Sequence, residues 1–191
     1  MNRRCKKIIL FLLAFICTLM FACKSTSVAS ATNVNKITKE DKTGKKVYFA
    51  AALFNEGERE YNLKIASILE SYGYEVFLPQ RDGYNPDTLK GKTDEEIIDI
   101  IFKDDVEQIK KADILFAVLD GAVPDEGMCI EIGMAYANGK RCYGIRNDLR
   151  AAERGFDLNI MITGCFDKIF KDTDYEKLIT SFKEYLSKNE L

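Results

Sequence analysis

Residues 124–134 read PDEGMCIEIGM, and they follow the apolar run Ile114–Leu119 (ILFAVL). The run is short and wholly apolar, which is typical of a strand buried on both faces of a parallel sheet. Asp125 stands where a helix N-cap is expected, so a helix should begin directly after the strand and its turn. A strand and a helix at this spacing predict one βα unit of an α/β fold. The carboxyl ends of such strands form the ligand crevice of the fold.

Glu131 is the unusual residue of this stretch, because it lies between Ile130 and Ile132 in the predicted helix. Such a position normally carries an apolar side chain, so this carboxylate is either half-buried for a reason or turned to solvent. Together with Asp125 it places carboxylates in the first turns of the helix, beside the expected crevice. The residues alone leave both interpretations of Glu131 open.

Strand-like and helix-like segments alternate on both sides of this unit. The predicted strands are 46–53, 74–78, 113–119, 141–145 and 165–170, and the predicted helices are 58–72, 93–111, 125–138 and 175–186. Thr93 and Glu96 form a capping-box pattern, and Gly73 and Gly139 follow helix ends. The alternation predicts an α/β, flavodoxin-like or Rossmann-like three-layer domain with a five-stranded parallel sheet. No GxGxxG follows the first strand and no GxxxxGKS/T occurs, so dinucleotide and P-loop nucleotide binding are not supported.

The first 22 residues have the pattern of a secretory signal peptide, with a basic start and an apolar stretch at 8–21. The segment 20–23 resembles a bacterial lipobox, so we expect Cys23 to be lipidated and residues 23–45 to form a flexible polar tether. The protein would then be an exported lipoprotein, anchored to a membrane of the bacterial cell envelope. Cleavage after Ala31, which would give a soluble secreted protein, and an uncleaved anchor helix are the alternatives. Residues 46–191 are expected to form one folded domain.

The chain contains no histidine, which excludes the commonest general base and the commonest zinc ligand. Chemistry must therefore rest on carboxylates, tyrosine, cysteine or lysine. Cys129, Cys142 and Cys165 are odd in number and lack a CxxC spacing, so neither a metal site nor a disulfide framework is indicated. We expect Cys142 and Cys165 to be buried in strands, which would protect their thiols. The net charge of -2, and the lack of a Lys/Arg cluster with interleaved aromatic residues in the part expected to fold, make binding to nucleic acid a poor hypothesis.

Four segments along the domain resemble one known family. They are residues 47–54 (VYFAAALF), 75–83 (EVFLPQRDG), 105–113 (DVEQIKKAD) and 119–140. In this order and spacing they are similar to the nucleoside 2-deoxyribosyltransferases, over nearly the whole domain. The resemblance implies transfer of a 2-deoxyribosyl group between nucleobases through a covalent glycosyl-glutamate, with 2′-deoxynucleosides and free nucleobases as substrates and without a metal or organic cofactor.

The resemblance also implies roles for individual residues. Glu131 matches the nucleophile, and Tyr48 matches a tyrosine that hydrogen-bonds it. Asp105 and Asp125 match two aspartates that contact the base, and either could carry the proton that the leaving base needs. Asn159 belongs to a segment that reaches into a neighbouring subunit, which implies a homo-oligomer. The other implied substrate contacts are Phe54, Gln80, Asp82 and Met161.

Each of these residues also has an ordinary structural interpretation. Asp125 could act only as an N-cap, Asp105 could lie on a solvated helix face, Tyr48 could be core and Asn159 could make a local turn. If Glu131 is the nucleophile, it must be ionised at neutral pH. We expect its place near a helix N-terminus to lower the pKa of its carboxyl.

Two other functions remain open at this point. A nucleoside or nucleoside 5′-monophosphate N-glycosidase would form the same ester and pass it to water. A 5′-phosphate would require cationic side chains, for which Arg81, Arg146 and Arg150 are the candidates. A non-catalytic lipoprotein that captures nucleosides would keep the fold without turnover.

Overall fold

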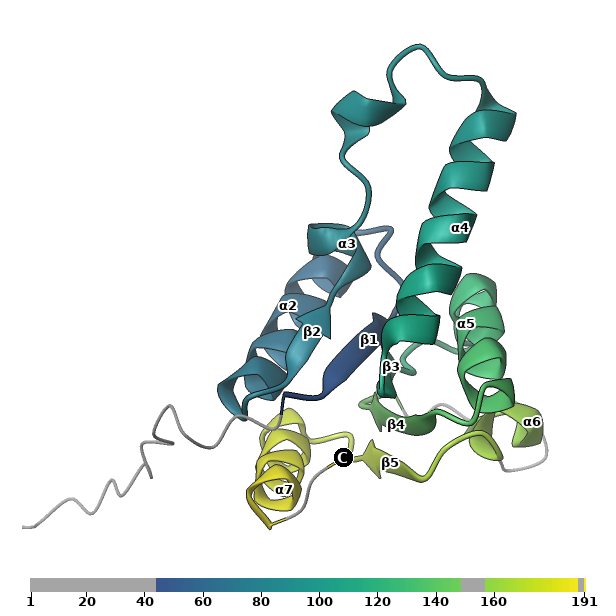
Figure 1. Ribbon diagram of the computed structural model, residues 1–191. Coiled ribbons are helices and arrows are strands. Elements are labelled where there is room, and N and C mark those ends of the chain that lie inside the picture. Colours follow the sequence, from purple (N-terminus) through teal and green to yellow (C-terminus); the bar gives the residue numbers. More distant parts are fainter. Residues whose placement is uncertain (1–43, 149–156, 189–190) are drawn as a thin grey trace, which may run out of the picture. The chain divides into compact units, whose positions relative to one another are not determined.

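The computed structural model describes residues 44–148, 157–188 and 191. Within them, five strands form one parallel sheet in the order β2-β1-β3-β4-β5 (Figure 1). The strands are β1 (Lys46–Ala50), β2 (Glu75–Phe77), β3 (Ile114–Val118), β4 (Arg141–Arg146) and β5 (Lys168–Lys171). This is the strand order of flavodoxin-like folds, so the predicted fold class is confirmed.

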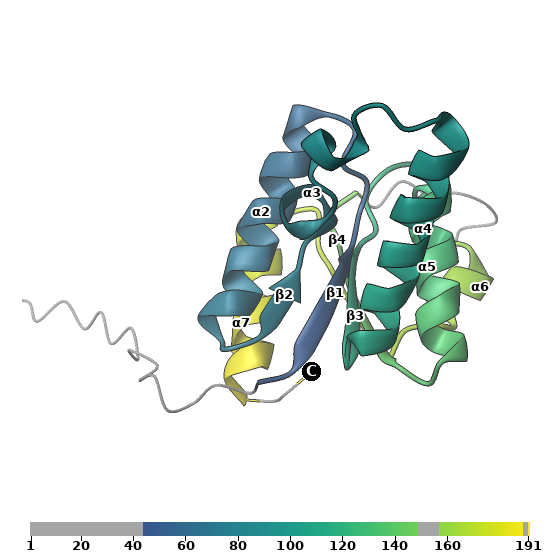
Figure 2. The same ribbon diagram turned by 45° about the horizontal axis from the view of Figure 1, so that its top comes forward.

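Helices cover both faces of the sheet (Figure 2). One face carries α2 (Glu56–Ser71) and α7 (Tyr175–Lys188), and the other carries α4 (Asp94–Lys111) and α5 (Glu126–Ala137). Because side chains alternate along a strand, β1 sends Val47 and Phe49 to the first face and Tyr48 and Ala50 to the second. This alternation fixes the side of the sheet on which Tyr48 lies.

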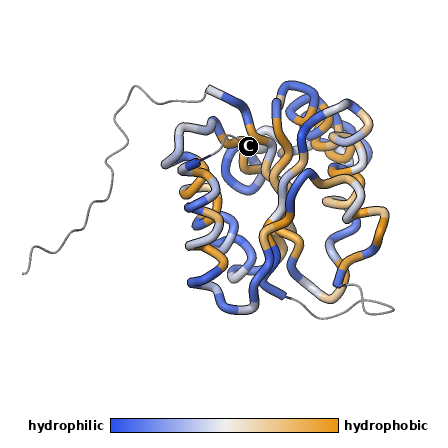
Figure 3. The backbone as a smooth tube through the Cα atoms, turned by 90° about the horizontal axis from the view of Figure 1, so that it is seen from below, coloured by the Kyte–Doolittle hydropathy of each residue, from blue (hydrophilic) through white to orange (hydrophobic). Residues whose placement is uncertain are grey.

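The α2/α7 face has an aromatic core. The ring of Phe182 on α7 lies 5.2 Å from that of Phe116 and 4.9 Å from that of Phe170, measured between centroids. All three rings are buried, and each contributes roughly 1.5–3 kcal/mol by leaving water. Figure 3 shows the apolar segments gathered along the sheet and the hydrophilic segments on outer turns and loops.

The helix ends follow the local sequence signals. Thr93 and Glu96 form the predicted capping box at the start of α4, and Asp125 is the N-cap of α5. Gly73 and Gly139 adopt positive φ values of 90° and 70° just after α2 and α5, where other residues would be strained. These local predictions are confirmed.

Residues 79–92, which lie between a predicted strand and a predicted helix, contain the short helix α3 (Pro79–Asp82) and the 3-10 turn η1 (Pro86–Leu89). A further short helix, α6 (Ile160–Thr163), was not predicted either. Cys142 is buried in β4 as expected. The expectation for Cys165 was wrong, because its thiol lies half-buried in the turn after α6 rather than in a strand.

The predictions for the signal peptide, Cys23 and the tether up to residue 43 lie outside the described residues. No helix within residues 44–148 and 157–188 is long and apolar enough to cross a membrane.

Candidate active site

Tyr48 and Glu131 form the centre of the site. Tyr48 is fully buried in β1, and its hydroxyl donates a hydrogen bond of 2.7 Å to Oε1 of Glu131 on α5. The two residues are 83 positions apart in the sequence. The pKa of the Tyr48 hydroxyl is raised strongly, first by burial and then by the neighbouring Glu131 and Asp105 carboxylates. Tyr48 therefore keeps its proton and holds one oxygen of Glu131 in a fixed direction.

The packing of α5 aims Glu131 toward the sheet. Asp125 accepts the N–H of Met128 at 2.9 Å and so fixes the first turn of the helix. Met128, Ile132 and Ala135 are buried against β1 and β3, while Glu131 lies half-buried beside them. The apolar contacts on either side therefore hold the carboxylate at the edge of the core.

Asp105 comes to the same place from α4. It lies one turn before the buried Ile109, so both side chains project from one face of the helix. Burial raises the pKa of Asp105, while the nearby Tyr48 hydroxyl opposes that rise. The structure thus brings four sequence-predicted residues together, because Asp105 and Asp125 both act on the charge of Glu131.

The pKa of Glu131 is raised to about 7, chiefly because burial penalises its charged form. The hydrogen bond from Tyr48 lowers this pKa, whereas the charges of Asp105 and Asp125 raise it. The expectation of a lowered pKa was therefore wrong. Glu131 is the sixth residue of α5, beyond the turn in which a helix N-terminus stabilises anions.

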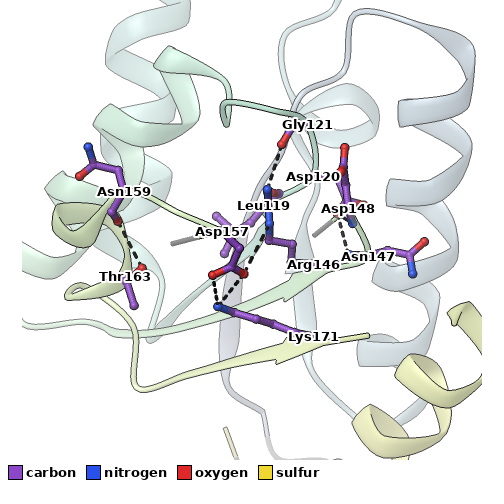
Figure 4. Close-up of polar contacts among 10 residues, drawn as sticks. All are labelled: Leu119, Asp120, Gly121, Arg146, Asn147, Asp148, Asp157, Asn159, Thr163 and Lys171. Atoms are coloured by element: carbon purple, nitrogen blue, oxygen red, sulfur yellow. Dashed lines mark hydrogen bonds and ion pairs between the residues drawn. The ribbon is translucent and has the colours of Figure 1, made fainter. Parts of the chain in front are cut away.

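Polar contacts hold the ends of β3 and β4 together (Figure 4). Arg146 is fully buried, and its guanidinium donates to the carbonyl oxygens of Leu119 and, at 3.1 Å, Gly121. The Asp120 carboxylate accepts the N–H groups of Asn147 at 2.6 Å and Asp148 at 2.9 Å. These bonds fix the segment that leads from β3 into α5, and they are therefore a support for Glu131.

Sequence reasoning missed Asp120 and misjudged Arg146 as a candidate phosphate ligand. Each of these charged residues directly follows or ends an apolar strand. A charged group at such a position needs a partner within the fold, so this pattern could have predicted a structural role for both. In the part of the chain that the structure describes, no three acidic or cysteine side chains converge into a group that could hold a metal ion.

A family model for nucleoside 2-deoxyribosyltransferases matches residues 47–163. The chain belongs to this family. The matched range contains Tyr48, Asp105, Asp125 and Glu131, the four residues that the fold brings together. A search of curated protein sequences found no match.

Solved structures place the same fold in related proteins. A 2-deoxyribosyltransferase from Bacillus psychrosaccharolyticus is 28% identical, with a TM-score of 0.56 over 70% of this chain and 95% of its own. A conserved protein from Enterococcus faecalis V583 is 25% identical, with a TM-score of 0.59 over 76% of this chain and 98% of its own. A CMP N-glycosidase from Clostridium botulinum shares the fold at 21% identity, with a TM-score of 0.51 over 74% of this chain and 99% of its own.

The residues that the family resemblance placed over the base have partners within the fold. Asp82 accepts the N–H of Leu78 at 2.9 Å and two hydrogen bonds from Arg81, and Arg81 also donates to the carbonyl of Val76. These bonds satisfy outward-facing backbone groups of the edge strand β2 and its end. Gln80 accepts from the buried Asn62 at 3.0 Å and donates to the Arg59 carbonyl at 2.8 Å. Contact with a base stays a prediction for Gln80 and Asp82.

Three further predicted residues lie on the surface. Phe54 is 73% exposed after β1, and Met161 is 77% exposed on α6. Asn159 is the N-cap of α6, and its side-chain oxygen accepts the N–H of Met161 at 2.9 Å. Its backbone oxygen accepts a bond from Thr163 (Figure 4). The substrate-binding roles of all three stay predictions.

Proposed function

We propose that this family member transfers a 2-deoxyribosyl group between nucleobases, with Glu131 as the covalent centre. The observation that carries the proposal is the 2.7 Å hydrogen bond from the buried Tyr48 hydroxyl to Glu131. It leaves the second carboxylate oxygen of Glu131 to attack C1′ of the sugar. A pKa of about 7 leaves a substantial fraction of Glu131 ionised at neutral pH.

In the first step, the bond between C1′ and the ring nitrogen breaks and its electron pair stays on the base. A new bond forms between C1′ and Glu131, which gives a glycosyl ester. The leaving base gains a proton, and Asp105 is the better donor because its pKa is raised by burial. Asp125 is engaged with the N–H of Met128 and is suited to hold the base. In the second step, a ring nitrogen of another base attacks C1′, the ester breaks, and the proton returns to Asp105.

A hydrolase, for which the same ester would react with water, is the second candidate. A hydrolase of nucleoside 5′-monophosphates would need cationic side chains to bind the phosphate, and two of the three candidates have other partners. Arg81 pairs with Glu70 and Asp82 at 2.8 Å each, and Arg146 is fully buried and donates to backbone carbonyl groups. Arg150 lies outside the described residues. A role limited to nucleoside capture is disfavoured, because a binding protein has no use for an oriented, half-buried carboxylate.

A base-exchange assay tests the proposed function. The full chain, purified in detergent, is incubated with 2′-deoxyinosine in the presence and absence of adenine, and the products are separated by chromatography. We expect deoxyadenosine only when adenine is present, and none from a Glu131→Gln variant that keeps its circular dichroism spectrum. Release of hypoxanthine and free deoxyribose without exchange would replace the transferase with the hydrolase. No change in any nucleoside would favour the capture role.

We also propose that Asn159 and Met161 contact the substrate of a neighbouring copy. Both are exposed on α6, and Ile130 and Tyr136 on the adjoining helix α5 are also exposed. Native mass spectrometry of the active protein should find an oligomer. A stable monomer with full activity would remove this role.

The N-terminal pattern leads to a separate proposal on location. We propose that the chain is exported and carries a lipid on Cys23. The N-terminus of protein isolated from membranes should begin at a lipidated Cys23; a mature chain beginning at Thr32 would support the soluble alternative.

A further inference from the structure

Asn62 on α2 is a polar side chain at a core position. It is 2% exposed and begins the buried stripe that Ile65 and Leu69 continue along the helix. An apolar side chain usually fills such a position, because burying an amide costs stability unless the amide is hydrogen-bonded. The partners of Asn62 therefore indicate what its amide contributes.

The Asn62 amide joins two segments of the chain. Its Nδ2 atom donates to the carbonyl oxygen of Ala52 at 2.9 Å and to Oε1 of Gln80 at 3.0 Å. Ala52 lies in the segment that follows β1, and Gln80 lies on α3, which follows β2. One buried side chain thus ties together the segments that follow two neighbouring strands (Figure 2).

Two further hydrogen bonds complete this network. Nε2 of Gln80 donates to the Arg59 carbonyl at 2.8 Å, and the Arg59 guanidinium donates to the Leu53 carbonyl at 3.1 Å. Arg59 is exposed and Gln80 is half-buried, whereas Asn62 is shielded from water. Hydrogen bonds in a shielded place are strengthened electrostatically and are costly to leave unmade, so we expect Asn62 to hold the network together.

The joined segments lie next to the proposed nucleophile. Tyr48 in β1 stands opposite Phe77 in β2, and their rings stack at 5.8 Å between centroids. The Tyr48 hydroxyl donates to Glu131. Residues 51–54 and 78–82 leave the sheet directly beyond this pair of rings, at the carboxyl ends of both strands, where the ligand crevice of such folds opens.

The proposed chemistry places the base on this side of the crevice. Asp105, which would protonate the leaving base, is close enough to Tyr48 for each group to affect the pKa of the other. It projects from α4, which packs against β1. A base that reaches Asp105 therefore lies on the β1 side of the crevice, beside the segment that Asn62 holds.

We propose that Asn62 is a positioning residue for base binding, which acts through Ala52 and Gln80 on the wall of the crevice after β1 and β2. This inference rests on the proposed function and extends it to a residue that does not touch the substrate. Loss of the Asn62 hydrogen bonds should loosen that wall and weaken the binding of the base, while the bond between Tyr48 and Glu131 stays in place.

Three variants separate this role from a contribution to stability alone. Asn62→Leu has a similar volume and cannot donate, so Ala52 and Gln80 lose their partner. Gln80→Leu removes the other side of the bridge at a half-buried position, and it keeps the test open if Asn62→Leu fails to fold. Leu69→Ala is the matched control, because it destabilises the same buried stripe of α2 without touching the network.

The measurements are the KM for adenine and the kcat of base exchange with 2′-deoxyinosine, in the full chain, together with the dissociation constant of adenine from calorimetry. We expect Asn62→Leu to raise the KM and the dissociation constant by about tenfold, with kcat within about threefold of the wild type and the acidic limb of the kcat profile unmoved. The double variant Asn62→Leu/Gln80→Leu should be no worse than the worse single variant, because both residues act through one bridge. Leu69→Ala should lower thermal stability and keep the wild-type KM.

The inference is overturned if Asn62→Leu loses thermal stability but keeps the wild-type KM and dissociation constant, as a merely structural residue would. Effects of the two single variants that simply add would also overturn it. Should Asn62→Leu not fold, a wild-type KM in Gln80→Leu has the same meaning. If the wild-type protein exchanges no base, the proposed function fails by itself, and the dissociation constant of adenine still tests Asn62. Absence of both exchange and adenine binding in the wild type would remove the two proposals together.

Discussion

The two faces of the sheet are packed with different kinds of side chain. Phe49, Phe116 and Phe170 project toward α2 and α7, where Phe182 completes a cluster of rings. On the opposite face, the strands present smaller groups, such as Ala50 and Ala117, beneath α4 and α5.

The α4/α5 face is also the one that buries polar chemistry. Tyr48, Glu131 and Asp105 meet there, and the pKa values of all three groups are raised chiefly by burial. Burying a carboxyl costs stability unless it becomes neutral or is well bonded. The packing of the aromatic face therefore offsets the free energy that it costs to bury the carboxyl groups on the other face.

Removing a ring from the aromatic face should give the largest change in stability. Phe182→Ala deletes a fully buried ring that contacts Phe116 and Phe170, so we expect the free energy of unfolding to fall by about 3–5 kcal/mol. Turnover per folded molecule should stay near the wild-type value, because the proposed catalytic residues Tyr48, Asp105 and Glu131 lie on the opposite face of the sheet. Urea unfolding measures the free energy of unfolding, and an activity assay at low temperature measures turnover per folded molecule.

Leu63→Ala, at a 42% exposed position of α2, is the control and should cost much less. A large loss of turnover in folded Phe182→Ala protein would break the separation between the two faces.

Glu131→Gln should raise the free energy of unfolding at neutral and alkaline pH, whereas Phe182→Ala lowers it. The folded state holds the Glu131 proton up to about pH 7, whereas the unfolded chain releases it near its ordinary pKa of 4.5. The wild-type protein therefore loses stability as the pH rises from about 4.5 to about 7, and the neutral variant does not. Above pH 7 we expect the inactive variant to be more stable by about 2 kcal/mol, allowing for partial exposure.

Unfolding curves of the wild type and Glu131→Gln at pH 4.5 and pH 8 test this expectation. Equal differences at the two pH values would mean that Glu131 is not strained by burial, and the contrast between the faces would then rest on packing alone.

Local signals in the sequence were enough for much of the fold. Thr93 with Glu96, Asp125 and Gly73 mark helix ends through contacts within a few residues, and the apolar runs mark the buried strands. The grouping of the site residues came from the family resemblance; the structure brings Tyr48, Glu131 and Asp105 together, and the substrate contacts stay predictions.

Other features depend on partners that are distant in the sequence. Burial in the folded protein is the main cause of the raised pKa of Glu131, with smaller effects from Tyr48 and Asp105. Arg146 donates to carbonyl groups 25 and 27 positions away. Helix α3 and the bonds of Asp82 arise because the edge of β2 needs donors and acceptors that no neighbouring strand provides. Sequence patterns within a few residues do not predict such long-range contacts.

Tyr48→Phe should produce the smallest change and the most specific one. The variant keeps the ring, which stacks on Phe77 at 5.8 Å, but removes the hydrogen bond that favours the Glu131 anion. The pKa of Glu131 should then rise above about 7, so the acidic limb of the kcat profile should move to higher pH by up to about one pH unit. At pH 7 this shift and the lost orientation should lower kcat by about tenfold, while at higher pH part of the activity should return.

If Tyr48 were only a core residue, kcat would fall equally at every pH or not at all, and the acidic limb would stay in place. A limb that moves to lower pH would contradict the donor role of the Tyr48 hydroxyl, because the loss of a hydrogen-bond donor cannot stabilise the Glu131 anion.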